Sequence, residues 1–309
     1  MSGSEFVVSA VLTIITAATP LVYAALGELI VEKSGVLNLG VEGMMIVGAV
    51  SSFAIGVTTE SALSAILCGA ISGALISGIF GFLVLIMMAN QVATGLALTI
   101  FGLGLSALFG HEFVGMAYTG LERVNIPFLS QIPIAGPIIF GQDIMVYGSV
   151  FLTVIIFWFL TRTRLGLTLR AVGENHEAAH AIGLSVVKVR FMAILFGGAM
   201  AGLGGAYLSL VYTPLWVENM TAGRGWIALA LVVFSSWRPW RAFMGAYLFG
   251  GIAILQLHLQ GVGFAISPQL LSMLPYLVTI VVLVLISNGS LGYHLRAPGS
   301  LGKSFYSPS

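Results

Sequence analysis

Long apolar stretches recur along the whole chain and restrict its fold more than any other feature does. A transmembrane helix needs about 20 consecutive, mostly apolar residues. The candidate stretches are 7–27, 36–57, 62–88, 94–110, 144–161, 191–213, 220–237, 242–259 and 273–287. Gly223-Arg224-Gly225 interrupts the run 220–237, so a re-entrant half-helix is the alternative there. Lipid offers no partners to backbone N–H and C=O groups, so such segments cross as helices. The sequence therefore predicts an all-α, polytopic membrane protein with about nine (8–10) transmembrane helices, in a single transmembrane domain over residues 1–309.

The composition agrees with a chain that lies mostly in lipid. It is 58% hydrophobic and only 7% charged, whereas about a quarter of the residues in soluble domains are charged. The single cysteine, Cys68, excludes an internal disulfide. Residues 1–9 contain Glu5 and no lysine or arginine, so they lack the basic segment of a cleavable signal peptide. We expect the first span to remain in the mature protein.

The long hydrophilic interval at residues 162–190 sets the expected orientation. It holds five of the twelve lysines and arginines, and basic loops stay on the cytoplasmic side. With this loop inside and the spans alternating, only Arg123 and Arg224 of the basic residues fall outside. We therefore expect a multi-pass protein of the cell (inner) membrane. Loop 162–190 and the C-terminus would be cytoplasmic, and loop 111–143 would be extracytoplasmic.

Small residues at a spacing of four mark two of the expected spans. One stripe is Gly69, Gly73, Ser77 and Gly81, and the other is Gly197, Ala201 and Gly205. Small side chains let membrane helices pack at close range. Ordinary bundle packing explains both stripes, and a subunit or gating interface is the alternative.

Four polar residues beside or within the apolar runs are candidates for a substrate pathway: Asn38, Glu42, Asn90 and Gln91. A carboxylate inside a span is costly and often functional. Asn38 and Glu42 are four residues apart, so we expect them on one helical face. The alternative for Glu42 is a structural pairing with Lys33 or with a backbone amide. Asn90 and Gln91 could instead simply begin a helix.

Two segments match motifs of other protein classes. Residues 176–180 (His-Glu-Ala-Ala-His) have the spacing of a zinc-protease helix. Catalytic zinc needs a third protein ligand, and this motif lies in the most polar stretch of the chain. Residues 297–304 fit the loose form of a phosphate-binding loop, which requires a strand before it and a helix after it. We expect neither a metal nor a nucleotide at these sites.

Three motifs together give a resemblance that extends over nearly the whole chain. They are residues 27–45 (GELIVEKSGVLNLGVEGMM), residues 163–205 with the runs TRLGLTLRAVGEN and GGAMAGLGG, and residues 223–250 with the runs GRGWIALA and SSWRPW. In these motifs the chain resembles the permease subunits of ATP-binding-cassette (ABC) importers for branched-chain amino acids, simple sugars and nucleosides. Residues 235–240, where sugar permeases tend to carry a glycine-rich segment, look more like the nucleoside branch, as do residues 32–35.

The resemblance implies a type II-like importer permease that performs no covalent chemistry. Its implied partners are a cytoplasmic ATPase that hydrolyses ATP, a second similar permease or a second copy of this chain, an extracytoplasmic substrate-binding protein, and membrane lipid. It implies no cofactor and no nucleic acid. Nucleosides or related purines are the expected substrates, and a simple sugar or branched-chain amino acid permease is the alternative. The rivals from other classes are an ion-coupled carrier, with Glu42 as its coupling carboxylate, and an intramembrane zinc protease.

The segment from Gly173 to Gly183 is similar to the cytoplasmic coupling region of these permeases. We expect it to form a short helix that seats in a groove of the ATPase. Acidic residues favour the positive N-terminal end of a helix, small apolar residues can enter a partner groove, and glycine ends a helix. The residues expected to serve this coupling are Glu174, Asn175, Glu177, Ala178, Ala179, Ile182 and Gly183.

Overall fold

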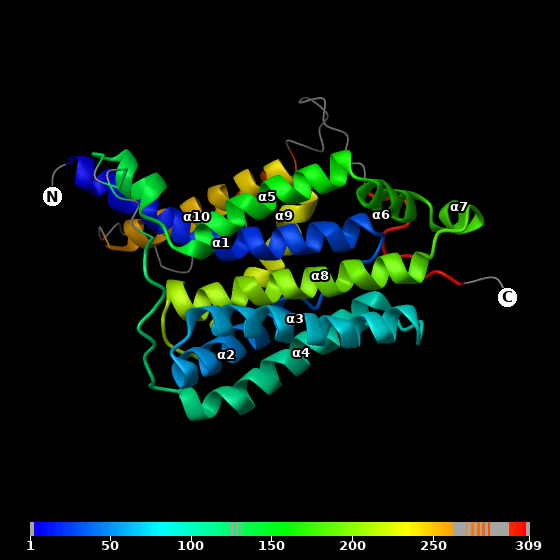
Figure 1. Cartoon of the computed structure of the whole chain (residues 1–309), viewed down its shortest axis with the longest axis horizontal. Coiled ribbons are helices and arrows are strands. Elements are labelled where there is room, and N and C mark those ends of the chain that lie inside the picture. Colours follow the sequence, from blue (N-terminus) through cyan, green and yellow to red (C-terminus); the bar gives the residue numbers. More distant parts are fainter. Residues whose placement is uncertain are drawn as a thin grey trace.

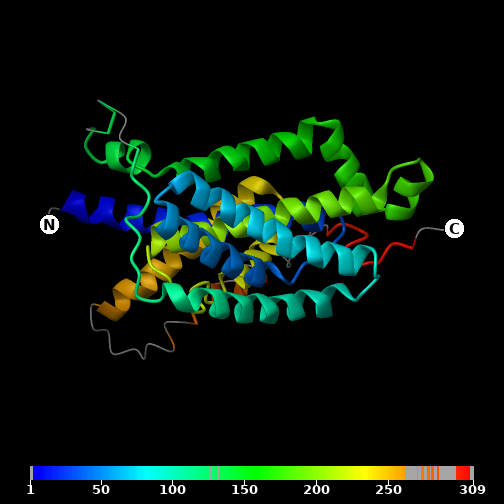
Figure 2. The same ribbon diagram turned by 60° about the horizontal axis from the view of Figure 1, so that its bottom comes forward.

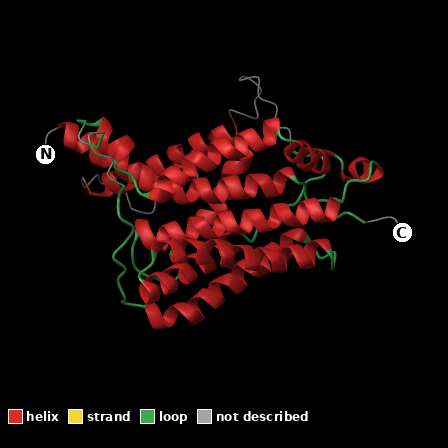
Figure 3. Cartoon of the chain, viewed as in Figure 1, coloured by secondary structure: helices red, strands yellow, loops and turns green. Residues whose placement is uncertain are grey.

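Helices make up the regular structure of the chain. The computed structural model describes residues 3–124, 127, 129–130, 132–261, 270, 273–274, 277–278, 280–281, 284 and 297–306. These residues are helical apart from loops, turns and two isolated β-bridges, as Figure 3 shows. Six of the helices are long and apolar enough to cross a membrane. The prediction of an all-α, polytopic membrane protein is confirmed.

The helices follow one another through short connections, with one long excursion between α4 and α5. The first five are α1 (Gly3–Lys33), α2 (Val41–Thr59), α3 (Ala62–Leu85), α4 (Gln91–Gly110) and α5 (Ile144–Arg162). The later ones are α6 (Arg164–Glu174), α7 (His176–Ala181), α8 (Val186–Tyr207), α9 (Arg224–Phe234) and α10 (Pro239–Gly261). A 3-10 turn, η1 (His111–Phe113), and two π-helical turns, η2 (Gly136–Phe140) and η3 (Leu208–Tyr212), lie between them.

The expected count of about nine transmembrane helices is not confirmed. The six apolar spans are α1 to α5 and α8 with η3. Residues 220–237 do not form one continuous span, because α9 has only 11 residues. Such a helix is about 16 Å long, roughly half of a ~30 Å hydrocarbon core. The stretch 242–259 lies in the 23-residue α10, and most of 273–287 lies outside the described residues.

Polar side chains fix where several helices begin. The Asn90 carboxamide accepts a hydrogen bond from the amide of Ala93 at the start of α4, over 3.0 Å. The Asp143 carboxylate accepts from the amides of Met145 and Val146 at the start of α5, over 2.9 and 3.0 Å. The first amides of a helix have no partner within the helix, so these residues supply one. The helix starts are thus set locally by sequence.

Helix α8 lies at the centre of the bundle, between α1 and α3 (Figure 1), and it also packs on α2. The small-residue stripes meet there. A Cβ atom on Gly202 would overlap the carbonyl oxygen of Gly69, and one on Gly73 would overlap that of Gly198. A Cβ atom on Gly48 of α2 would lie 2.5 Å from the Cα of Gly202. Both stripes therefore serve close packing within the bundle.

The connecting segments divide between two ends of the bundle. Helices α6 and α7 and the described C-terminal residues 297–306 lie together at one end, and the N-terminus lies at the other (Figures 1 and 2). The turn between α1 and α2 is at the end that carries α6, because the amide of Ser300 bonds to the carbonyl of Gly173 and that of Gly302 to the carbonyl of Gly35. The expected coupling region and the described C-terminal residues 297–306 therefore share one end of the molecule.

Candidate functional site

Glu42 lies buried in the first turn of α2 and binds the beginning of α9. One carboxylate oxygen accepts hydrogen bonds from the Thr221 hydroxyl (2.6 Å) and the Gly223 amide (2.8 Å). The other accepts from the Gly225 amide (2.6 Å). Because the N-terminal end of a helix is positive and its first amides need acceptors, a carboxylate is well suited to this position. Of the two interpretations that the sequence leaves open, these contacts fit the pairing with backbone amides.

Two glycines make this arrangement possible. Gly223 has φ +81°, a left-handed conformation that favours glycine, and it places its amide toward Glu42. A Cβ atom on Gly225 would lie 2.6 Å from the Cα of Glu42. The run Gly223-Arg224-Gly225 is therefore explained by the close approach of α9 to α2.

Asn38 lies in the turn between α1 and α2. Its side-chain oxygen accepts a hydrogen bond from the Gly40 backbone amide (2.9 Å), and the backbone amide of Asn38 donates to the Glu28 carboxylate (3.2 Å). The expectation that Asn38 and Glu42 share a helical face is wrong, since α2 begins only at Val41. Asn38 instead shapes the turn that leads into the helix.

Gln91 reaches the same turn from the start of α4. Its side-chain oxygen accepts from the amide of Leu37 over 2.8 Å, and its buried Nε2 has no hydrogen-bond partner among the described residues. Its neighbour Asn90 is exposed and begins α4. The structure thus brings Gln91 and Asn38 to one turn and leaves Asn90 at the surface.

Two buried carboxylates on α1 were missed in the sequence analysis. Glu28 and Glu32 are each 1% exposed. One carboxylate oxygen of Glu28 accepts a hydrogen bond from the Asn38 backbone amide, and the other has no partner among the described residues. Glu32 accepts from the indole N–H of Trp237 over 2.6 Å. Their spacing of four residues in an apolar helix was the available signal, since both fall on one face.

The expected coupling helix is present in a shorter form. Helix α6 ends at Glu174, and α7 begins after Asn175, whose side-chain oxygen accepts from the Ala178 amide over 3.0 Å. Gly183, with φ +87°, follows the end of α7. Glu174 therefore lies at the C-terminal end of α6, and only Glu177 is in the first turn of α7. The placement of Glu174 at the start of the coupling helix is wrong, because Asn175 divides the segment into two helices.

The two faces of α7 have different surroundings. Ala179 is 3% exposed and packs within the chain against Val172, Val186 and Phe305. Ala178 is exposed, and Ile182 is 76% exposed. The expectation that Ala179 enters a partner groove is wrong, since its own chain already covers it. The apolar surface available to a partner is formed by the other face.

Arg190, near the start of α8, holds this end of the molecule together. Its guanidinium is fully buried and donates to the carbonyl oxygens of Ser34 (3.1 Å) and Lys303 (3.0 Å). A third nitrogen lies 3.1 Å from Nδ1 of His176. In the sequence, Arg190 stands out only as one of five basic residues in the loop 162–190. No local pattern marks it, because its three partners are far apart in the sequence.

The histidines of the His-Glu-Ala-Ala-His motif pack around one aromatic ring. The Phe305 ring lies edge-on to His176 and His180, with centroid distances of 5.4 and 5.2 Å. Burial and the neighbouring Arg190 lower the pKa of His176, which favours the neutral ring, and a neutral ring with its proton on Nε2 can accept from the guanidinium at Nδ1. Among the described residues, no three His, Cys, Asp or Glu side chains form a metal-binding group.

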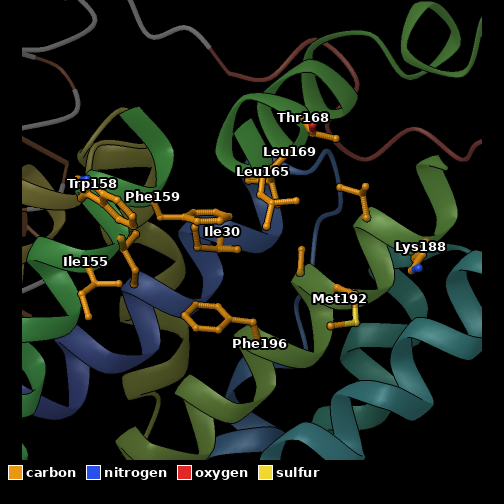
Figure 4. Close-up of a pocket in the computed structure, with 13 residues that line it drawn as sticks. Ile30, Ile155, Trp158, Phe159, Leu165, Thr168, Leu169, Lys188, Met192 and Phe196 are labelled. Atoms are coloured by element: carbon orange, nitrogen blue, oxygen red, sulfur yellow. The ribbon is translucent and has the colours of Figure 1, made fainter. Parts of the chain in front are cut away.

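An apolar cavity of about 570 Å³ opens between α1, α5, α6 and α8 (Figure 4). Thr168 and Lys188 are the polar side chains among the thirteen that line it. Phe159 and Phe196 face each other across it, as the close-up shows. A polar solute requires hydrogen-bonding groups in its site, so this cavity does not suit one.

Comparison with known proteins agrees with this architecture. The described residues form a polytopic helical bundle with six helices long and apolar enough to cross a membrane. The family described as branched-chain amino acid transport system / permease component matches residues 10–299. The chain belongs to this family of ABC permeases.

Three relatives illustrate the range of the family. The putative glucose ABC transporter permease of Haloferax volcanii is 38% identical over 94% of this chain and 95% of its own length. The nucleoside ABC transporter permease NupC of Lactococcus lactis is 32% identical over 64% of this chain and 65% of its own. The guanosine ABC transporter permease NupQ of Bacillus subtilis is 34% identical over 53% of each chain.

Proposed function

We propose that this chain is the transmembrane permease subunit of an ABC importer for nucleosides or related purines. It would supply part of the pathway and transmit the work of a separate cytoplasmic ATPase, without covalent chemistry of its own. A second similar permease, or a second copy of this chain, would complete the pathway, and an extracytoplasmic binding protein would deliver the substrate. Lipid would surround α3, α4 and α5, whose outer faces carry exposed large apolar side chains.

The relatives NupC and NupQ, described as nucleoside and guanosine permeases, support the nucleoside assignment, and Glu32 and Trp237 mark the segments that carry the resemblance. These residues belong to the two segments, 32–35 and 235–240, that look most like the nucleoside branch. The indole N–H and the carboxylate lie 2.6 Å apart in the protein interior. Two segments some 200 positions apart in the sequence are thus in direct contact.

A simple sugar is the second candidate, because the Haloferax volcanii relative covers nearly the whole chain and is described as a putative glucose permease. Uptake measurements separate the two. The chain should be produced with its partner subunits in a host that lacks nucleoside and glucose uptake, and labelled guanosine, uridine and glucose should be supplied. Uptake of a nucleoside that excess glucose does not reduce is the expected result. Uptake of glucose alone would replace the proposal with the sugar assignment.

The four polar residues Asn38, Glu42, Asn90 and Gln91 remain our proposal for the pathway, and their contacts suggest different roles. Gln91 has a buried side-chain NH₂ group without a partner among the described residues, and this group could donate a hydrogen bond to a substrate oxygen. Asn38 and Glu42 position the turn and the start of α9 beside it. Asn90 sets the start of α4. Gln91→Leu is therefore expected to raise KM, whereas Asn90→Ser, which keeps a capping oxygen, is expected to leave KM unchanged.

The exposed face of α7 is the surface that we propose docks on the ATPase, which would place this end of the bundle in the cytoplasm. An apolar side chain that is 76% exposed, as Ile182 is, gains when a partner groove removes it from water. Ile182→Arg should therefore separate ATP hydrolysis from transport, and Ile182→Leu is the matched control. In a Cys68→Ser background, a cysteine at Ile182 should cross-link to the ATPase. Absence of that cross-link in a transporting complex would refute the docking role.

A further inference from the structure

The described C-terminal residues 297–306 lie along the end of the bundle that carries α6 and α7. The amide of Ser300 donates to the carbonyl of Gly173 over 2.9 Å, and the amide of Gly302 donates to the carbonyl of Gly35 over 3.1 Å. These bonds join the segment to α6 on one side and to the α1–α2 turn on the other. The segment is thus fixed by backbone contacts to two separate parts of the membrane domain.

The same segment contacts α7 directly. The Ser300 hydroxyl accepts from the amide of His176, the first residue of α7, over 3.2 Å. Phe305 is 6% exposed and packs with Ala179 and between the rings of His176 and His180. The inner face of α7 therefore rests on the C-terminal segment.

Arg190 connects these contacts to the transmembrane helices. From α8 it binds the α1–α2 turn at Ser34, the C-terminal segment at Lys303 and the start of α7 at His176. A buried guanidinium needs its donors satisfied, and here three acceptors from three separate segments meet it. If any one of these segments moves away, a buried cation loses a partner. The junction therefore favours joint movement of α7, the C-terminal segment and α8.

We propose that residues 297–306 form a strap that holds α7 in its docking position. Phe305 of the strap packs against α7, and Arg190 of α8 binds the strap through the Lys303 carbonyl. This inference rests on the proposed docking of α7 to the ATPase. Helix α7 has six residues, too few to be stable alone, since isolated helices below about 12–15 residues are marginal in water. Its position must come from its neighbours. When the ATPase moves α7, the strap transmits that movement to α8 and to the α1–α2 turn.

The test uses the complete importer, with the permease partner, the ATPase and the binding protein, reconstituted in lipid vesicles. The measured quantity is substrate taken up per ATP hydrolysed. Phe305→Ala removes the ring that seats α7 and should lower this ratio about tenfold, within the range typical of coupling between sites. Phe305→Leu retains apolar bulk and should recover most of it. Lys303→Ala is the matched control, because Arg190 binds the backbone carbonyl of Lys303 and the side chain is exposed.

A wild-type ratio in an assembled Phe305→Ala transporter would overturn the strap. If that variant does not assemble, Ser300→Ala replaces it, because it removes only the hydroxyl that accepts the His176 amide. A wild-type ratio there would overturn the proposal equally. The cross-link at Ile182 separates this failure from failure of α7 docking. A cross-link with an unchanged ratio in the variants refutes the strap alone, and no cross-link in the otherwise unchanged chain refutes the docking role.

Discussion

Replacement of Glu42 should loosen the beginning of α9 more than any other part of the bundle. The carboxylate accepts three hydrogen bonds, from the Thr221 hydroxyl and from the amides of Gly223 and Gly225. Glu42→Leu leaves all three donors without this acceptor. A buried donor without a partner costs about 1–3 kcal/mol, so the loss is roughly 3–9 kcal/mol. Rotation of the hydroxyl toward another acceptor places the expected value near the lower half, about 4 kcal/mol.

Glu42→Gln should have a smaller effect. The oxygen of the carboxamide can still accept from Thr221 and Gly223, but its NH₂ group meets the Gly225 amide, donor against donor. One lost charged hydrogen bond corresponds to about 1.5–3 kcal/mol. The predicted order of stability is therefore wild type, Glu42→Gln, Glu42→Leu. Transport should follow the same order, because the start of α9 lies beside the proposed pathway.

The assay is hydrogen exchange of the purified protein, read over residues 223–227, together with the apparent Tm. Glu60→Gln is the matched control, since Glu60 is exposed at the other end of the same helix. Faster exchange confined to the beginning of α9 in both Glu42 variants is expected. Wild-type exchange and wild-type Tm in Glu42→Leu would refute the argument that this carboxylate holds α9.

Two further outcomes follow from the packing of α8 and from the lowered pKa of His176. Gly202→Ala should destabilise the bundle by about 1–3 kcal/mol or more, because the added methyl meets the backbone at Gly69. The apparent Tm measures this effect. An unchanged Tm would show that α3 and α8 can move apart without a loss of stability. Burial and Arg190 lower the pKa of His176 below its ordinary value of 6.5, so its contribution to stability is complete above the unfolded pKa and is lost as pH falls through the lower folded pKa. Acid should therefore release α7, seen as faster hydrogen exchange over residues 176–182 at about pH 5 than at about pH 7.5. His176→Gln, which keeps an acceptor for Arg190, should remove that pH dependence, and if it does not, another group is responsible.

The helix boundaries illustrate what local sequence can predict. The expected spans 62–88 and 144–161 correspond closely to α3 and α5, since apolar length and capping side chains determine where a helix runs. For 220–237 the sequence left open a full span or a re-entrant half-helix, and the 11-residue α9 has the length of a half-helix. The hydropathy of 220–237 resembles a span, but the glycines at its start allow α9 to approach α2 and end short. Hydropathy measures transfer into lipid and contains no information about such a contact.

The candidate sites divide in the same way. The short helix after Asn175 and its end near Gly183 could be predicted, because capping and left-handed glycine are local effects. Which face of α7 remains free could not be predicted, since Ala179 is covered by Phe305 from the far end of the chain. The role of Glu42 was left open for the same reason, because its three donors lie about 180 positions away in the sequence.

The sequence by itself determined that this protein lies in lipid and that it is a bundle of helices. Apolar runs of bilayer length must become helices in lipid, and the stripes of small residues allow those helices to pack closely. The tertiary structure alone decided which polar groups meet inside the bundle. Glu32 meets Trp237, and Arg190 joins three segments that no sequence pattern connects. The physical reason is that burial makes each polar group require a partner, while the identity of that partner depends on how the helices pack.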